Sequence, residues 1–252
     1  SGQAIDGVTF DNCQAVRTGS GKTVASGGCG FKVLGATDDQ SPNNRHRNIR
    51  YLNCTVEDVA NKIPSPNCSG FNIGKCDGVV LENCSVVSTV AGQPSAAYGV
   101  VMIGSGNGTI TNPRFENPTG DGVRLYWTET TPTAQWGNEP TNITISGGVM
   151  IGCRAGLGVN VGGQTVRRLA MSGTVIDGVT NAVTSANATI RWSLLDISAS
   201  NIAGDTLSGC DGFMVRGAGV LTGTSACRVG STWVDYAGGF KRYTGAAWAL
   251  LE

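Results

Sequence analysis

The stretches VTFDNC at residues 8–13, IRYLNC at 49–54 and VVLENC at 79–84 repeat nearly the same six residues. In each stretch apolar side chains alternate with other side chains, and this period of two is typical of a β-strand with one buried face. Each stretch ends in Asn-Cys. Asn tolerates the left-handed backbone conformation and bridges backbone groups, while Cys is small enough to turn inward. The repeat therefore predicts a strand followed by a corner.

A second motif, in which a glycine precedes alternating apolar residues, is interleaved with the first. It occurs in CGFKVLG, SGFNIGK, YGVVMIG, DGVRLYW, LGVNVGG and DGFMVRG, which begin at residues 29, 69, 98, 121, 157 and 211. We expect the glycine of each copy to turn a corner with positive φ; these glycines are Gly30, Gly70, Gly99, Gly122, Gly158 and Gly212. The alternation predicts that the intervening side chains face solvent, among them Thr9, Arg50, Lys32, Asn72 and Arg124.

Copies of the two motifs advance along the chain together, at steps of about 25–40 residues. With weaker copies included, the first ladder of apolar residues is Val8, Ile49, Val79, Ile110, Ile143, Leu169 and Leu194. The second ladder is Phe31, Phe71, Val100, Val123, Val159, Val183 and Phe213. Two ladders in step predict a coil of stacked rungs, which is a parallel β-helix. A leucine-rich repeat would need a leucine pattern that is absent, and a propeller would need four antiparallel strands per repeat.

Composition agrees with an all-β chain and excludes several partners. The 252 residues are 40% hydrophobic and only 14% charged, and 38 of them are glycine. Lys plus Arg equals Asp plus Glu at 18 each, so no net charge attracts nucleic acid or a membrane, and we expect neither as a partner. The start SGQAIDG has no feature of a signal peptide, and we expect an upstream N-terminal part to be missing.

Nine cysteines occur without a C-x-x-C pair. We expect them to be reduced, as in a cytosolic assembly, with Cys13, Cys54, Cys84 and Cys153 facing inward in one common column. The single histidine, His46, argues against a metal site, and GSGKT at 19–23 lacks the first glycine of a phosphate-binding loop. We therefore expect neither a metal nor a cofactor.

The repeats and their rungs resemble the right-handed parallel β-helix of pectate-lyase-like proteins, and most of all the shafts of bacteriophage tailspikes. The resemblance covers about residues 4–216, without a diagnostic active-site motif. The repeats predict about seven rungs, which at the usual strand spacing make a column roughly 35 Å long. We expect the β-helix to occupy residues 1–216 and a short antiparallel aromatic cap, similar to the endings of phage tail proteins, to occupy 217–252. Its aromatic residues lie within 227–252: Trp233, Tyr236, Phe240, Tyr243 and Trp248.

Insertions between rungs are where a rigid column displays function. The most distinctive insertion, at residues 126–141, begins YWTETTPTAQWGNEP. Aromatic faces stack on sugar rings and carboxylates bind hydroxyls, so we expect a glycan platform of Tyr126, Trp127, Trp136 and Glu139. The alternative is that these tryptophans pack against a neighbouring rung or chain.

Two kinds of glycan cleavage fit the residue types near this edge. Hydrolysis needs two carboxylates, and the candidates are Glu57, Asp58, Asp121 and Glu129. A lyase needs a base beside a group that neutralises a uronate, and Lys75, Arg124 and Tyr126 are candidates. Asp121 precedes a corner glycine, so a turn role is the stronger interpretation of that residue.

The resemblance implies a phage tailspike or tail-fibre protein that forms a homotrimer and binds a bacterial surface polysaccharide. Whether the protein also cuts the polysaccharide stays open. Its localisation would be the virion tail, assembled in the host cytoplasm and acting at the bacterial cell surface. Two alternatives stay open: a non-catalytic virion fibre or receptor-binding protein, and a free-standing polysaccharide lyase or glycoside hydrolase.

Overall fold

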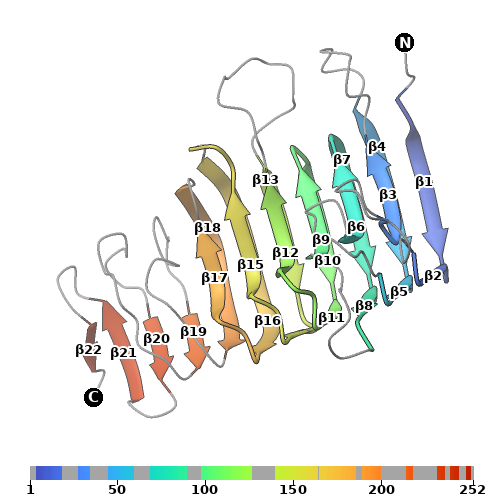
Figure 1. Cartoon of the computed structure of the whole chain (residues 1–252). Coiled ribbons are helices and arrows are strands. Elements are labelled where there is room, and N and C mark those ends of the chain that lie inside the picture. Colours follow the sequence, from blue (N-terminus) through green and yellow to red (C-terminus); the bar gives the residue numbers. More distant parts are fainter. Residues whose placement is uncertain are drawn as a thin grey trace.

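The computed structural model describes residues 4–18, 28–34, 45–59, 69–89, 98–126, 140–163, 165–185, 189–199, 214–217, 232–235, 239–243 and 248–250. Every regular element in these ranges is a β-strand, and parallel pairing prevails (Figure 1). The fold is therefore all-β, with parallel strands stacked in sheets. This arrangement is compatible with the parallel β-helix that the sequence predicts.

The strands up to β17 follow one another in triplets, so that strands of one kind lie side by side and form three stacks. The first stack contains β1 (Asp6–Asp11), β4 (His46–Leu52), β7 (Cys76–Glu82), β10 (Gly106–Thr111), β13 (Thr141–Ser146) and the start of β16 (Thr165–Asp177). The second stack contains β2 (Gln14–Val16), β5 (Thr55–Glu57), β8 (Ser85–Val87), β11 (Arg114–Glu116), β14 (Val149–Ile151) and the end of β16. The third stack contains β3 (Phe31–Leu34), β6 (Ser69–Gly74), β9 (Tyr98–Ile103), β12 (Asp121–Tyr126), β15 (Ala155–Asn160) and β17 (Asn181–Ser185).

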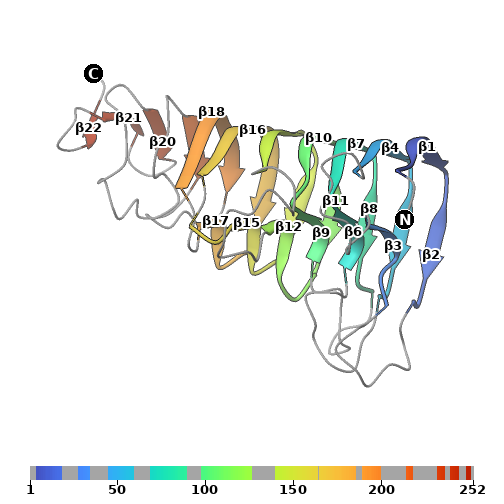
Figure 2. The ribbon, with the colours of Figure 1, turned by 90° about the horizontal axis from the view of Figure 1, so that it is seen from above.

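The first and third stacks are seen as two layers facing each other when the column is turned (Figure 2). Beyond β16, the strands β18 (Thr189–Ala199), β19 (Met214–Gly217) and β20 (Thr232–Asp235) continue the parallel pairing. The last strands, β21 (Gly239–Tyr243) and β22 (Trp248–Leu250), pair antiparallel. Antiparallel pairing therefore occurs within 227–252, where the sequence predicts an antiparallel cap. The domain boundary at residue 216 and the capping role of this segment stay predictions.

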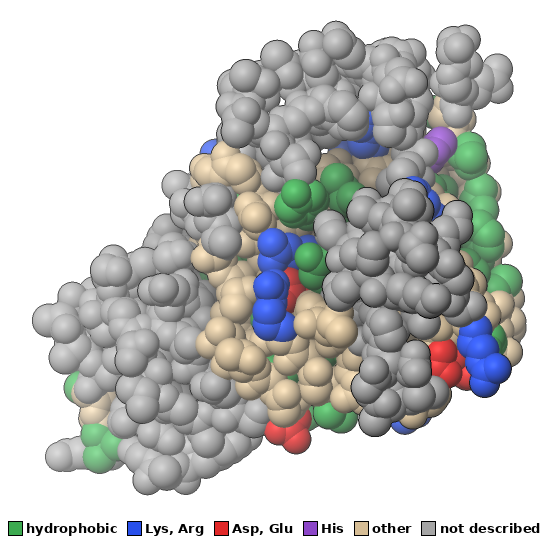
Figure 3. All heavy atoms as spheres, in the orientation of Figure 1, with side chains coloured by type: hydrophobic (Ala, Val, Ile, Leu, Met, Phe, Trp, Pro, Cys, Tyr) green, Lys and Arg blue, Asp and Glu red, His purple; other side chains and the backbone are tan. Residues whose placement is uncertain are grey.

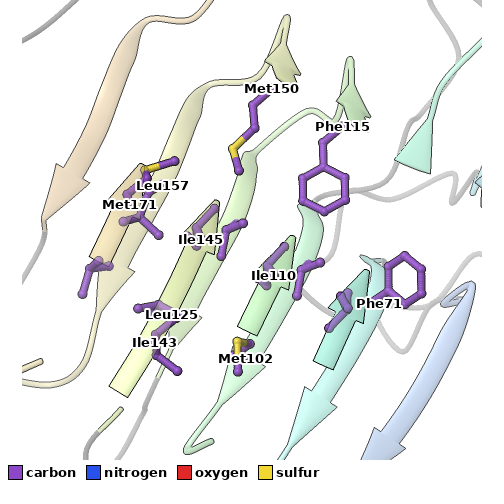
Figure 4. Close-up of a cluster of buried hydrophobic side chains, with 14 of the residues drawn as sticks. Phe71, Met102, Ile110, Phe115, Leu125, Ile143, Ile145, Met150, Leu157 and Met171 are labelled. Carbon is purple, nitrogen blue, oxygen red and sulfur yellow. The ribbon is translucent and has the colours of Figure 1, made fainter. Parts of the chain in front are cut away.

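Inward-facing side chains from all three stacks fill the space between the layers with one apolar core (Figure 4). Near its start the core is aromatic: Phe10 stacks on Tyr51 with ring centroids 5.0 Å apart, and Phe31 stacks on Phe71 at 5.3 Å. Further along, aliphatic and methionine side chains such as Leu125 and Met171 predominate, with single rings at Phe115 and Trp192. Each fully buried side chain of this size contributes about 1.5–3 kcal/mol to stability.

Within the described residues, which do not include Phe213, the two predicted ladders are confirmed except at three places. Gly108 takes the place expected for Ile110, Trp192 that of Leu194, and Leu157 that of Val159. At Gly108 and at Leu157 the predicted register is wrong by two residues. An offset of two residues leaves the same side chains facing inward. At Gly108 a Cβ atom would lie 2.7 Å from Met102 Cε, so the glycine leaves room for that side chain in the core. At Trp192 the cause is a register shift between β16 and β18, which leaves Leu194 43% exposed.

The Asn corners behave as the sequence predicts. Asn12, Asn53 and Asn83 have φ of 51°, 53° and 52°, in the left-handed region. From Asn53 onward the side chains form a ladder along the column: Asn83 Nδ2 donates to Asn53 Oδ1 at 3.3 Å, and Asn112 Nδ2 donates to Asn83 Oδ1 at 3.2 Å. The ladder therefore extends one strand beyond the three motifs that revealed it.

The corner glycines have a different cause from the one expected. Gly30, Gly70, Gly99 and Gly122 are not among the residues with positive φ. They are glycine because the backbone passes too close to its neighbours: a Cβ on Gly70 would lie 2.2 Å from Val86 Cγ2 and 2.8 Å from Gly99 O. Gly156, and not Gly158, continues this row, and Gly212 lies outside the described residues.

The cysteines within the described ranges are free, as predicted. Cys54 and Cys84 are buried at the corner after the first stack, where Cys84 Sγ donates to Tyr51 O at 3.3 Å, and Cys13 occupies the same corner with partial exposure. Cys153 is buried but follows β14, so it lies at another corner and the predicted common column is wrong for it. The similar sequence context of Cys153 hid this difference.

Solvent exposure is confirmed for Thr9, Arg50 and Lys32 but not for the other two residues predicted to face outward. Asn72 is 1% exposed, and the side chain of Arg124 is 11% exposed. Both lie in the third stack. The described ranges hold no helix long and apolar enough to cross a membrane.

Candidate functional site

The outer face of the third stack carries a row of residues in register across its strands. The row runs Lys32, Asn72, Val101, Arg124, Gly158 and Thr184, and each member alternates with inward core residues such as Phe71 and Leu157. Asn72 and Val101 are buried although they lie outside the core cluster. This face is turned toward the viewer in Figure 3, where basic side chains with an acidic one between them gather near its middle.

A buried carboxylate, Asp121, lies beside Arg124 of this row. Its side chain is fully buried, and both of its oxygens accept hydrogen bonds from arginines. Arg154 Nη2 donates to Oδ1 at 2.8 Å and to Oδ2 at 3.0 Å, and Arg154 Nε donates to Oδ1 at 3.1 Å. Arg124 Nη1 donates to Oδ2 at 2.9 Å. Asp121, Arg124 and Arg154 are called the arginine cluster below.

Strand register brings the arginine cluster together. Asp121 opens β12 and pairs with Ala155, which follows Arg154 and opens β15. The backbone holds the same junction, because Arg154 N donates to Gly120 O at 2.7 Å. Gly158 supplies the space: a Cβ there would lie 1.9 Å from Asp121 Oδ2 and 2.8 Å from Arg124 Nη1. The glycine expected to form a corner thus makes room for an ion pair.

Two tyrosines lie beside Arg124. The guanidinium carbon of Arg124 is 5.9 Å from the ring centroid of Tyr98 and 6.0 Å from that of Tyr126, within range of a cation–π interaction. Burial raises the pKa of the Tyr98 hydroxyl, although the charge of Arg124 opposes the shift. Tyr98 therefore stays neutral and able to donate a hydrogen bond at neutral pH. Both rings are partly exposed, so a ligand on this face can reach them.

The arginine cluster has spare positive charge and spare donors. Among the described residues, two guanidinium groups face one carboxylate, which leaves a formal charge of one unit. Arg124 Nε is buried without a hydrogen-bond partner, and Arg154 remains 53% exposed with its Nη1 engaged by no described residue. An unpartnered buried donor is costly, so this arrangement suits a site that receives oxygen atoms from a ligand.

Three of the residues predicted for a site come together here: Asp121, Arg124 and Tyr126. Trp127, Glu129, Trp136 and Glu139 lie outside the described residues, immediately after β12 in the chain. Their predicted roles in a platform or in catalysis stay predictions.

The carboxylates at the end of β5 serve a separate corner. Asp58 has a φ of 50°, and its two oxygens accept from the backbone N and Oγ1 of Thr89, both at 2.7 Å. Glu57 Oε1 accepts from Gln14 Nε2 at 3.2 Å across the second stack. These partners explain both side chains as parts of the column.

Lys75 also lies at a corner, between β6 and β7, with a φ of 52° and 8% exposure. The neighbouring strand β4 begins at His46, whose Nδ1 accepts from Ile5 N at 3.0 Å, and Arg45 donates to the carbonyl of Gly104. Desolvation lowers the pKa of Arg45, with Asp77 acting in the opposite direction. This basic corner lies between β6 and β7, whereas the arginine cluster lies at the start of β12 and β15.

Sequence reasoning missed Tyr98 and Arg154. Tyr98 precedes the corner glycine of its motif as Asp121 does, so alignment of the copies placed both residues at one position. Arg154 was hidden by the two-residue error that aligned Val159 in place of Leu157. With the correct alignment, Arg154 falls beside Asp121.

Comparison of the chain with protein-family models, with curated proteins and with solved structures found no match. Among the described residues, no group of three or more His, Cys, Asp or Glu side chains is arranged to hold a metal ion.

Proposed function

We propose that this chain is the shaft of a bacteriophage tailspike or tail-fibre protein and that it binds a bacterial surface polysaccharide. In this proposal the stacked strands form a right-handed β-helix of about seven rungs, closed by residues 217–252 as a cap that also joins three chains. The parallel stacks support the shaft, because such a column presents a long, rigid outer face.

The observation that carries the binding proposal is the arginine cluster flanked by Tyr98 and Tyr126. Sugar recognition combines an aromatic ring for the apolar face of the sugar with fixed donors for its oxygens. Both are present within 6.0 Å of Arg124, on the outer face of a stack. The chain then continues into residues 127–139, where the sequence places two further tryptophans.

Binding without cleavage is favoured by the state of Asp121. Both of its oxygens are engaged by arginines and its side chain is fully buried, so it has no free position from which to transfer a proton. Asp58 is similarly engaged by Thr89. Cleavage would thus depend on carboxylates elsewhere, such as Glu129, and the free-standing enzyme remains the alternative.

The test is a binding panel. Capsule and O-antigen preparations from many bacteria are titrated against the chain, and the sizes of any products are followed by chromatography. We expect at least one polysaccharide to bind and to keep its length. Shortened products with the ultraviolet absorbance of an unsaturated uronate would indicate a lyase, and other short products a hydrolase. Binding to none of the preparations would contradict the proposal.

Two variants locate the binding surface. Tyr126→Ala removes an aromatic face and should weaken binding by about 1–3 kcal/mol. Thr144→Ala, on the exposed outer face of the first stack, is the control and should bind as the parent does. Equal weakening by both changes would contradict this placement.

The trimer is tested by light scattering, where the mass of a single chain at micromolar concentration would contradict it.

A further inference from the structure

We infer that the polysaccharide is acidic and that the arginine cluster receives a monoanionic oxygen group on it, a uronate carboxylate or a bridging phosphodiester. This inference rests on the proposed function and specifies the chemical class of the glycan. Its basis is the formal charge of the arginine cluster, in which two arginines face one carboxylate.

A structural role for Asp121 explains only part of this arrangement. One guanidinium is enough to neutralise one buried carboxylate, and Arg154 alone provides bidentate contact through Nε and Nη2. The second guanidinium, Arg124, is 11% exposed and keeps a buried Nε without a partner. Holding a second cation beside the first costs free energy through repulsion and desolvation. An anionic ligand would offset both costs.

The geometry of the free donors suits a planar or tetrahedral anion. Arg154 uses one edge of its guanidinium for Asp121, and its remaining Nη1 lies on a side chain that is 53% exposed. Guanidinium groups bind carboxylate and phosphate oxygens with directed, charge-assisted hydrogen bonds. The partly exposed ring of Tyr98 lies beside them, 5.9 Å from the guanidinium carbon of Arg124. Among the described residues, Asp121 is the only carboxylate that contacts either arginine of the cluster.

A neutral sugar would leave this charge uncompensated, since hydroxyl groups supply oxygens but no charge. Charge balance therefore favours a glycan that places one negatively charged sugar unit on each protein chain. Because part of the site is shielded from water, the interaction is screened less than a surface ion pair would be.

The experiment uses matched pairs of polysaccharides. Hexuronate-containing capsules are compared with the same capsules after reduction of their carboxyl groups to alcohols, and phosphodiester-linked glycans are compared with their dephosphorylated fragments. Neutral O-antigens complete the set. Affinities are measured by calorimetry for the parent chain, for Arg154→Ala and for the control Arg114→Ala, which removes an arginine 62% exposed on the second stack.

We expect the parent to bind at least one acidic glycan and to lose about 10- to 100-fold in affinity when its carboxylate or phosphate is removed. Arg154→Ala should cause a loss of similar size for the acidic glycan and little further loss for the neutralised one. Arg114→Ala should bind as the parent does. Whichever chemical treatment abolishes binding identifies the anion as carboxylate or phosphate.

Two results would overturn the inference, and they are distinguishable. Tight binding of neutral and neutralised glycans, with affinity unchanged by Arg154→Ala, would refute the acidic ligand and leave the proposed function standing. Binding to no glycan in the set would refute both. Thermal melting of each variant checks that a lost affinity does not come from an unfolded chain.

Discussion

The first and third stacks belong to the same column, yet they meet solvent differently. In β4 and β7 buried and exposed side chains alternate, so that Ile49 and Tyr51 are buried while Arg50 is exposed. In β6 every residue is buried, and in β15 all but the last are. The first stack therefore has one dry face, whereas the third stack has little exposed surface on either face.

This difference explains where the charged group arises. A charged side chain on the outer face of the first stack is solvated and needs no partner. On the outer face of the third stack, Asp121 and Arg124 are shielded from water, so each must be paired. The lesson is that alternation in a sequence gives the direction of a side chain but not its access to solvent. Shielded outer faces are therefore where a column of this kind concentrates specific polar contacts.

The largest expected effect concerns the close packing of the third stack. A Cβ on Gly99 would lie 2.5 Å from Gly122 O and 2.6 Å from Phe115 Cγ, whereas on Gly106 in the first stack the nearest atom is 3.5 Å away. Gly99→Ala should lower the free energy of unfolding by about 3 kcal/mol or more, because backbone must shift. Gly106→Ala should change it by less than about 1 kcal/mol. Urea titration of both variants measures this, and equal effects would refute the contrast between the stacks.

The next expected effect is a loss of stability at alkaline pH, caused by buried thiols at the corners of the column. Burial raises the pKa of Cys76 and Cys153 to about 12 and that of Cys84 to about 11, from an ordinary value of 9.0. Well below pH 9 these thiols are protonated in both the folded and the unfolded state. Above it the unfolded state loses protons first, so the free energy of unfolding falls as pH rises toward 11–12.

The slope should be about 1.4 kcal/mol per pH unit for each such thiol. Urea midpoints measured with reductant from pH 8 to pH 10.5 would show this slope. The upper end of that range is about 1.5 pH units above the ordinary thiol pKa. Cys76→Ala should make the decline shallower, since one titrating group is removed. A stability that is flat through this window would mean that the thiols are not shielded as the structure describes.

The sequence predicted the direction of side chains better than their surroundings. Period-two alternation identified the strands, and Asn53 and Asn83 were correctly placed at left-handed corners because that preference is local. The reason for Gly70 could not be found in this way, because the Val86 side chain that forbids a Cβ comes from the next strand of another stack. Arg154 was missed for a similar reason: its place beside Asp121 depends on a register that a two-residue offset conceals.

A smaller effect compares the Asn corners that follow the first and second stacks. Asn83 and Asn117 have φ of 52° and 56°, so alanine is strained equally at both. Asn83 also joins the side-chain ladder through Asn53 and Asn112, whereas Asn117 has no such hydrogen bond to a described residue. Asn83→Ala should cost about 2 kcal/mol and Asn117→Ala about 1 kcal/mol. Equal losses in thermal unfolding would mean that the ladder contributes nothing.

The smallest expected effect is that of Arg154→Ala on stability. The change removes three hydrogen bonds to Asp121, yet Arg124 continues to neutralise that carboxylate at 2.9 Å. Because the side chain of Arg154 is 53% exposed, water partly replaces it, and we expect a loss of about 1 kcal/mol. Arg124→Ala, which removes the more buried partner, should cost more.

Denaturant unfolding of both variants and of the double variant measures how far the two arginines act independently. If Arg154→Ala costs as much as Arg124→Ala, both arginines are needed for the fold and the spare charge on the third stack disappears as an argument for an anionic ligand.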